Sequence, residues 1–166
     1  MTAPVRGPGE GGTLVESVVD DGEHYDSSAQ RSSRRAVVRS RITMGEQTVA
    51  SVAANSMKKG DVLGTARYAG VQAAKDAASL LPLTTSIDVR STSINFELGE
   101  EAIDLEVVVE TAEGSGAEMP AFSAATAAAL TIYDMCKSAD RTMVIGPAQL
   151  VERSGDPSSP WRRADS

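Results

Sequence analysis

Residues 94–110 read Ile94-Asn95-Phe96-Glu97-Leu98-Gly99-Glu100-Glu101-Ala102-Ile103-Asp104-Leu105-Glu106-Val107-Val108-Val109-Glu110. Apolar and polar residues alternate with a period of two before and after Gly99 and Glu100, which is typical of two half-buried strands joined by a turn. One face of the second strand is apolar, with Ile103, Leu105, Val107 and Val109. The opposite face carries Asp104, Glu106, Val108 and Glu110. We therefore expect a β-hairpin with one buried and one solvated face.

Other segments continue this pattern on both sides of the hairpin. The expected elements are a strand at 36–44, a helical turn at 46–53, a helix at 61–80, a strand that begins at 87, a helix at 121–137 and a strand at 143–151 interrupted by Gly146-Pro147. The apolar parity changes between Ser93 and Ile94, which predicts a β-bulge there. Small residues along helix 61–80 permit close packing. The order βαββαβ predicts an α+β, ferredoxin-like fold, a four-stranded antiparallel sheet with two helices on one face.

The length of 166 residues indicates one domain with tails. Glycine and acidic residues dominate the first 25 positions, so we expect a disordered tail at 1–25. Proline, serine and charged residues predict a flexible C-terminal tail at 156–166. The domain itself then covers 26–155.

Composition excludes several classes of function. The net charge is −7, from 16 basic and 23 acidic residues, which argues against general nucleic-acid binding. A single cysteine excludes an internal disulfide and fits a reducing cytosol, and the single histidine, His24, excludes a His-rich metal site. We expect no secretory signal in the first 12 residues and no membrane-spanning segment, hence a cytoplasmic protein.

The run Leu130-Thr131-Ile132-Tyr133-Asp134-Met135-Cys136-Lys137 closes an alanine-rich helix. Asp134 and Lys137 are three residues apart and share one helical face. Because their neighbours are apolar, we expect the pair in a partly buried setting. The two groups either neutralise each other or serve as an acid/base couple.

Lys59 precedes the other expected helix. Asp61 can cap that helix, which would leave Lys59 beside a helix N-terminus that favours anions. The alternative is a solvated loop lysine next to a cap.

Two further groups of residues have two interpretations each. The glycine-rich segment Gly114–Pro120 either contacts a ligand or merely leads into a helix, with Glu118 complementing the helix start and Pro120 suiting its first turn. The arginines of the second group either keep an edge strand exposed to solvent or bind anions. They are Arg31, Arg34, Arg35, Arg39 and Arg41, with Arg153 beyond the last strand.

Three motifs together resemble the cyclic pyranopterin monophosphate synthase family (MoaC). The first is Lys59-Gly60-Asp61-Val62 followed by Thr65-Ala66-Arg67 and Ala69-Gly70-Val71-Gln72-Ala73-Ala74-Lys75. The second is Glu118-Met119. The third is Ala128-Ala129-Leu130-Thr131-Ile132-Tyr133-Asp134-Met135-Cys136-Lys137 followed by Met143-Val144-Ile145-Gly146-Pro147. The resemblance runs from Asp26 to Gly155.

This resemblance implies a ferredoxin-like protomer in a hexamer, a trimer of dimers, with the active site at a subunit interface. The implied reaction converts a nucleotide-derived substrate, the 3′,8-cyclised GTP derivative, into cyclic pyranopterin monophosphate and pyrophosphate for molybdenum cofactor biosynthesis. No metal or organic cofactor is implied. By motif, Lys59, Asp134 and Lys137 match the catalytic residues. Arg34 falls near a family arginine, and Glu118 matches the first of two family glutamates, so both are expected to bind substrate.

The chain departs from the family pattern at several positions. Where the family has Pro-Leu-Cys-His-Pro, this chain has Pro82-Leu83-Thr84-Thr85-Ser86, so Thr85 replaces the active-site histidine. Pro120 replaces the second glutamate, and Arg153 replaces a lysine of the family motif near the end. Thr85 and Arg153 are further candidates for substrate binding.

Three hypotheses follow from the motifs and the departures. The first is a divergent lyase/cyclase that uses Lys59 and Lys137 for phosphate binding and proton transfer. The others are a catalytically inactive binding or assembly protein, and an enzyme acting on another cyclised nucleotide.

Overall fold

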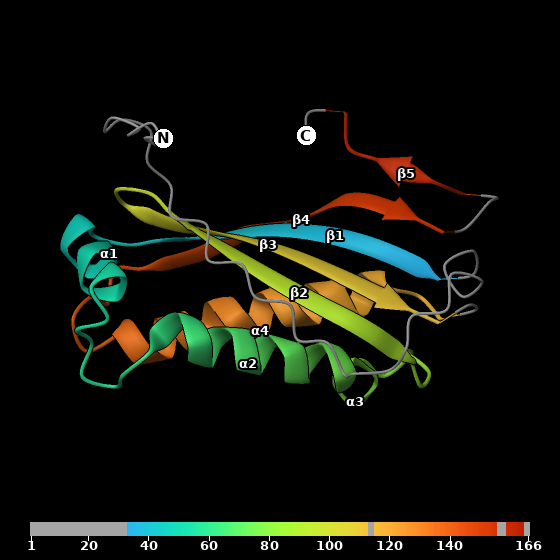
Figure 1. Cartoon of the computed structure of the whole chain (residues 1–166), viewed down its shortest axis with the longest axis horizontal. Helices are drawn as coiled ribbons and strands as arrows, with labels where there is room; N and C mark the ends of the chain where they lie inside the picture. Colours follow the sequence, from blue (N-terminus) through green and yellow to red (C-terminus); the bar gives the residue numbers. More distant parts are fainter. Residues whose placement is uncertain (1–32, 113–114, 156–158, 165–166) are drawn as a thin grey trace, which may run out of the picture.

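The computed structural model describes residues 33–112, 115–155 and 159–164. The elements are β1 (Arg34–Thr43), α1 (Glu46–Ala53), α2 (Val62–Lys75), α3 (Ala77–Leu80), β2 (Val89–Leu98), β3 (Ala102–Thr111), α4 (Glu118–Cys136), β4 (Val144–Ser154) and β5 (Trp161–Arg162). The strands form one sheet in the order β2-β3-β1-β4-β5, and every neighbouring pair is antiparallel. Figure 1 shows α2 and α4 side by side against one face of this sheet. The predicted tail at 1–25 and Arg31 lie outside the described residues.

The fold is α+β with an antiparallel sheet, but the expected number of four strands was wrong. Trp161 and Arg162 form β5, which pairs with Arg153 and Glu152 at the end of β4. Two residues are too few to show an alternating pattern, and the surrounding prolines, serines and charges favour a tail. The part of the chain that the structure describes therefore contains a five-stranded sheet.

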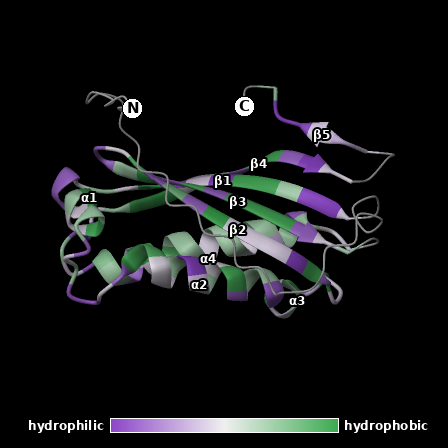
Figure 2. Ribbon diagram, viewed as in Figure 1, coloured by the Kyte–Doolittle hydropathy of each residue, from purple (hydrophilic) through white to green (hydrophobic). Residues whose placement is uncertain are grey.

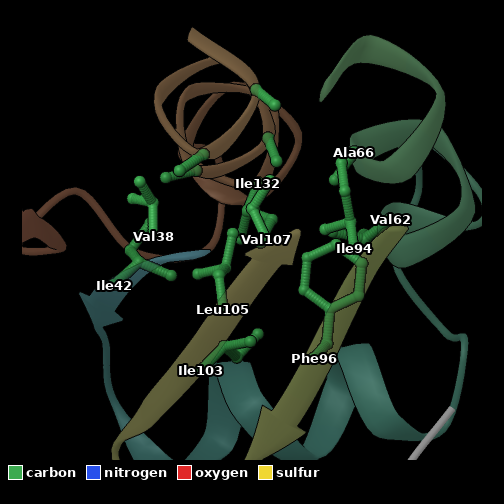
Figure 3. Packing of buried hydrophobic residues seen from close by; sticks show 14 of the residues in the cluster. Val38, Ile42, Val62, Ala66, Ile94, Phe96, Ile103, Leu105, Val107 and Ile132 are labelled. Atoms are coloured by element: carbon green, nitrogen blue, oxygen red, sulfur yellow. The ribbon is translucent and has the colours of Figure 1, made fainter. Parts of the chain in front are cut away.

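The predicted hairpin is confirmed, because Leu98 of β2 pairs with Ile103 of β3 and the ladder continues to the start of β2 and the end of β3, where Val89 pairs with Thr111. The alternation along β3 also matches the prediction. Its helix-facing side chains are at most 1 % exposed, namely Ile103, Leu105, Val107 and Val109. Figure 3 shows this face packed against the helices, with Val107 near Ile132. In Figure 2, green hydrophobic residues recur along β1, β2 and β3, and pale green ones along α4.

Close packing of the two long helices depends on Gly70 of α2. A Cβ atom added there would lie 2.3 Å from Ile94 Cδ1 and 3.0 Å from the main-chain oxygen of Ala124 in α4. Only a hydrogen fits at this position. The small residues expected to permit close packing therefore do so where α2 meets both α4 and β2.

Two helical details differ from the prediction. The helix expected at 61–80 is broken at Asp76, so that α2 ends at Lys75 and α3 begins at Ala77. The main-chain oxygen of Asp76 accepts hydrogen bonds from the N (2.9 Å) and Oγ (2.7 Å) of Ser79, which replace regular helical bonding. The second main helix begins at Glu118, three residues before the expected start.

The strands also differ in their irregularities. The register shift of β2 against β3 falls between Val89 and Ser91, so the bulge expected between Ser93 and Ile94 was wrong. β4 continues through Gly146 and Pro147, and its register against β1 shifts at this point. The interruption in the sequence thus marks a bulge within one strand. No helix among the described residues is sufficiently long and apolar to cross a bilayer.

Candidate active site

Lys59 lies in the connection from α1 to α2, directly before the start of α2. Gly60 has a φ of +90°, a left-handed conformation that suits glycine and turns the chain into the helix. Asp61 is the N-cap of α2, as predicted, and its Oδ1 accepts a hydrogen bond of 2.9 Å from Gly64 N. The cap and the glycine turn therefore fix the backbone at Lys59.

Asp134 and Lys137 extend from the end of α4. Ile132, Met135 and Cys136 are buried, so the other side of this last turn faces solvent. The side chains of Asp134 and Lys137 are 54 % and 51 % exposed. The expectation of a partly buried pair was wrong, because the apolar neighbours point into the core while the charged pair points away from it.

The structure brings Lys59 to this pair. Lys137 Nζ donates to Asp134 Oδ1 at 2.7 Å, and Lys59 Nζ donates to Asp134 Oδ2 at 2.8 Å and to the main-chain oxygen of Asp134 at 2.9 Å. We call Lys59, Asp134 and Lys137 the charged trio. An ammonium group has three N–H donors. Within the described residues, one donor of Lys59 and two of Lys137 remain for other acceptors.

The two ammonium groups control the charge of Asp134. They lower its pKa from 3.8 to about 2, and the hydrogen bond from Lys137 is the largest cause, followed by that from Lys59. Asp134 is therefore ionised at neutral pH, and the charged trio carries one positive charge in excess. Such a group can bind an anion, because a phosphate oxygen can accept the remaining N–H donors.

Arg153 and Glu118 form a second cluster, which we call the Arg153 cluster. Arg153 Nη1 donates to Glu118 Oε1 at 2.8 Å, which joins β4 to the first residue of α4. The guanidinium group also donates to the main-chain oxygen of Ser159, from Nη2 at 2.7 Å and from Nε at 3.2 Å, and to Ser159 Oγ. The segment that carries β5 thus supplies part of the surroundings of Arg153.

The remaining candidate residues belong to segments at the same end of the sheet as this second cluster, where Val89 pairs with Thr111 and Arg35 with Ser154. Arg34 begins β1 and pairs in register with Thr111, whose Oγ1 donates to the main-chain oxygen of Ser115 just before α4. Thr85 is exposed in the connection 81–88 between α3 and β2. That connection ends at Asp88, whose main-chain oxygen accepts a hydrogen bond from Ala112 N at 2.9 Å. Gly114, in the predicted glycine-rich segment, lies outside the described residues.

The charged trio and the Arg153 cluster lie at opposite ends of α4. Glu118 begins the helix and Asp134 lies in its last turn. At a rise of 1.5 Å per residue their Cα atoms are separated by about 24 Å. Figure 1 shows α4 alongside α2, with the end of α4 near the start of α2 and the beginning of α4 toward α3. One protomer therefore does not bring the seven candidate residues into one site.

The arginines of β1 have a structural role that the sequence did not indicate. β1 lies between β3 and β4, so the interpretation as an edge strand was wrong. Arg41 forms two hydrogen bonds with Asp104 (2.7 and 2.8 Å), and this partner raises the pKa of Arg41. Arg39 pairs with Glu106 (2.9 Å) and Arg35 with Glu152 (2.7 Å). These three arginines neutralise carboxylates on the face of the sheet away from the helices.

Asp140 is a further residue near the charged trio. Its carboxylate accepts hydrogen bonds from Gly45 N, Thr142 N and Thr142 Oγ1, which lower its pKa, the Gly45 bond being the largest cause. The spacing of Asp140 and Thr142 is compatible with a local turn, but nothing in the sequence indicates the bond to Gly45. In the ranges 33–112, 115–155 and 159–164, no three His, Cys, Asp or Glu side chains are grouped to hold a metal ion.

Comparison with known proteins gives consistent matches over most of the chain. The model of the MoaC family matches residues 26–156. A cyclic pyranopterin monophosphate synthase of Natranaerobius thermophilus is 40 % identical, covering 85 % of this chain and 96 % of the relative. The synthase of Pelobacter propionicus is 39 % identical over 84 % of this chain and 88 % of the relative. A molybdenum cofactor biosynthesis bifunctional protein of Chlorobaculum tepidum is 41 % identical over 76 % of this chain and 40 % of the relative.

Proposed function

Since the chain belongs to the MoaC family, we propose that it is a lyase of molybdenum cofactor biosynthesis, a cyclic pyranopterin monophosphate synthase. Its substrate would be the 3′,8-cyclised GTP derivative, and its products cyclic pyranopterin monophosphate and pyrophosphate. The single observation that carries this proposal is the position of Asp134 between Lys59 and Lys137. These three residues match the family's catalytic motif positions.

In this proposal, the charged trio binds the phosphate groups and moves protons. Lys59 and Lys137 offer N–H donors to the negative charge on the substrate, and either amine can exchange a proton with the ring that is being assembled. Asp134 keeps both ammonium groups in place through its ionised oxygens. The main-chain oxygen of Asp134 gives Lys59 a second acceptor. Lys59 therefore stays near the site even when its bond to the carboxylate is broken.

The substrate-binding residues would come from a neighbouring copy of the chain. Arg34, Glu118, Thr85 and Arg153 are the proposed group, and a single protomer holds Glu118 about 24 Å from Asp134 along α4. A second copy that presents the start of its α4 to the charged trio would complete the site. We accordingly propose a ferredoxin-like protomer, whose order β2-β3-β1-β4 is supplemented by β5, in a hexamer that is a trimer of dimers. Such an enzyme would act in the cytoplasm.

The direct test is turnover of the cyclised GTP derivative by the purified protein. We expect release of pyrophosphate together with cyclic pyranopterin monophosphate. Lys59→Ala should lower kcat/KM by about 10²- to 10⁴-fold, the usual range for loss of an acid/base group. Lys58→Ala removes the same charge from the adjacent position and should leave the rate near that of the wild type. A wild-type protein that neither binds nor converts the substrate, beside an active family member, contradicts the proposal.

Two substitutions support a different function for the same scaffold. Thr85 stands in place of the histidine, and Pro120, which replaces a glutamate, is fully buried in the first turn of α4. A binding or assembly protein without turnover would tolerate both. In that case Lys137→Ala leaves the cellular function intact, whereas loss of function in a persisting oligomer excludes a scaffold. An enzyme acting on another cyclised nucleotide would keep the effect of Lys137→Ala but fail with the GTP derivative.

A further inference from the structure

Asp140 joins the two segments that carry the charged trio. Its Oδ2 accepts a hydrogen bond of 2.8 Å from Gly45 N, across 95 residues of sequence. Its Oδ1 accepts from Thr142 N at 2.8 Å and from Thr142 Oγ1 at 2.7 Å. Both carboxylate oxygens are thus in use, one for the local turn and one for the start of α1.

On one side, the bond to Gly45 fixes α1 and the connection that follows it. Gly45 is the N-cap of α1 and, being glycine, has no capping side chain of its own. Asp140 takes the place of the acidic side chain that binds the N-cap N–H in a capping box. α1 ends at Ala53, and the connection that leads to Lys59 is bound to the helix, because Ser56 N donates to the main-chain oxygen of Ser51 at 3.0 Å. The orientation of α1 therefore influences the position of Lys59.

On the other side, Asp140 is held close to the end of α4. The N–H groups of Ala139 and Asp140 both donate to the main-chain oxygen of Cys136, at 2.9 and 3.1 Å. The turn after the helix is therefore tightly wound. Asp140 cannot move far without moving Lys137, and a short hydrogen-bonded path leads from the end of α4 to α1.

We propose that Asp140 is a positioning residue that holds the Lys59 ammonium group at bonding distance from Asp134. The hydrogen bonds of the Asp140 carboxylate go to Gly45 and Thr142 and to none of the three side chains, so Asp140 acts through Gly45 and α1. The proposal rests on the proposed function only in taking the charged trio as the active site. The geometry of the trio can be measured without turnover.

The test compares variants that break the Asp140–Gly45 bond from either side. Asp140→Ala removes the acceptor. Gly45→Pro removes the N–H donor, and the φ of −64° and ψ of 146° at Gly45 suit proline. Gly45→Ala is the matched control because it keeps the N–H, and its Cβ would lie 3.5 Å from Asp140 Oδ2, an ordinary contact. Thr142→Val is a second control, which removes only a local partner of Asp140.

The readout is the rate at which acetic anhydride acylates Lys59 relative to Lys58, measured by peptide mass spectrometry on the folded full chain. Lys58 is the exposed neighbour and serves as the reference in the same loop. We expect the ratio of the Lys59 and Lys58 acylation rates to rise by about twofold to fivefold in Asp140→Ala and Gly45→Pro. This is the range by which a surface ion pair can slow the acylation of its lysine. Gly45→Ala and Thr142→Val should leave the ratio at the wild-type value.

An unchanged ratio in a folded Asp140→Ala or Gly45→Pro variant overturns the proposal, as does an equal rise in Gly45→Ala. If Asp140→Ala does not fold, the two Gly45 variants decide the question. If the acylation ratio changes as expected but the wild-type protein does not convert the GTP derivative, the role of Asp140 is upheld and the proposed function is refuted. With turnover, Asp140→Asn should recover part of the kcat/KM lost in Asp140→Ala, because the amide oxygen can still accept from Gly45 N.

Discussion

Lys59 Nζ contacts two different oxygens of Asp134, the carboxylate Oδ2 at 2.8 Å and the main-chain oxygen at 2.9 Å. The first contact depends on the ionisation of Asp134, whereas the second does not. Lys137 reaches only the carboxylate, through Oδ1. The two lysines should therefore respond differently when Asp134 is protonated or replaced.

We predict that Asp134→Asn lowers the thermal stability of the protein in a pH-dependent way. The folded state lowers the pKa of Asp134 from 3.8 to about 2, so its ionised form stabilises the folded protein above about pH 4. This contribution is lost as the pH falls through the folded pKa. The difference in Tm between the wild type and Asp134→Asn should be constant near neutral pH, shrink below about pH 4 and be largely lost near pH 2.

The control for the pH dependence is the Asp134→Asn substitution in a Lys137→Met background. Because the Lys137 bond is the largest cause of the lowered pKa, the pH-dependent difference should shrink markedly there. A difference in Tm that stays constant down to pH 2 would show that the charge of Asp134 is not its source.

A second prediction concerns Thr85, which by the family resemblance takes the place of a histidine. Imidazole has an ordinary pKa near 6.5 and can accept or donate a proton at neutral pH, which a threonine hydroxyl cannot. If the proposed reaction is correct, Thr85→His should raise kcat by about tenfold or more, within the 10²- to 10⁴-fold range of such groups. The pH–rate profile should gain a new limb near this imidazole pKa.

Thr84→His is the matched control, since it places the same ring one residue away in the same connection. Equal rates for both variants and the wild type would mean that Thr85 does not face the substrate in the assembly.

The sequence predicts much of this fold because its strongest signals are local. The alternation from Ile94 to Glu110 is sufficient for the hairpin, and the spacing of Asp134 and Lys137 is sufficient for an ion pair on one helical face. The break at Asp76 could not be predicted in this way, since it depends on the competition between Ser79 and regular helical bonding.

Contacts between distant segments carry no comparable signal. Lys59 is 75 residues from Asp134, and only the family resemblance places both in one site before the structure is known. The bond from Asp140 to Gly45 and the pairing of Trp161 with Arg153 arise from tertiary geometry. The same holds for the charge pairs of β1, whose arginines match an edge strand as well as a central one until the strand order is known.

A third prediction tests the contact between α2, α4 and β2. Gly70→Ala would gain about 1 kcal/mol of helix propensity at an exposed site. At Gly70, however, the new methyl group meets the fully buried Ile94 and the backbone of Ala124, and overpacking of this kind costs about 1–3 kcal/mol. Because the 2.3 Å approach to Ile94 Cδ1 places this cost in the upper half of that range, we expect a net loss of about 1–2 kcal/mol in the free energy of unfolding after the propensity gain, measured with urea.

Gly116→Ala is the control for this prediction, because a Cβ there would meet nothing within 4 Å. Its free energy of unfolding should stay within about 0.5 kcal/mol of the wild type. A Gly70→Ala protein as stable as the wild type would show that Ile94 can move aside without cost.

The last prediction follows from the separation of Glu118 and Asp134 along α4. If the site combines the charged trio of one copy with the Arg153 cluster of another, substitutions at the two ends damage different halves of it. In a dimer of one Lys137→Ala chain and one Arg153→Ala chain, both losses fall in one site and the other site is intact. Two substitutions in the same half cannot be separated in this way.

We therefore predict complementation between opposite ends of the chain. Lys137→Ala and Arg153→Ala should each be nearly inactive alone, whereas a randomly mixed assembly of the two should recover up to about a quarter of the wild-type kcat per chain. Turnover is measured after the two differently tagged chains are co-expressed and purified through both tags in succession. A mixture of Lys137→Ala with Lys59→Ala should recover nothing, because each site then lacks one lysine. Equal recovery in both mixtures, or in neither, contradicts a site shared between copies, since only opposite halves can restore each other.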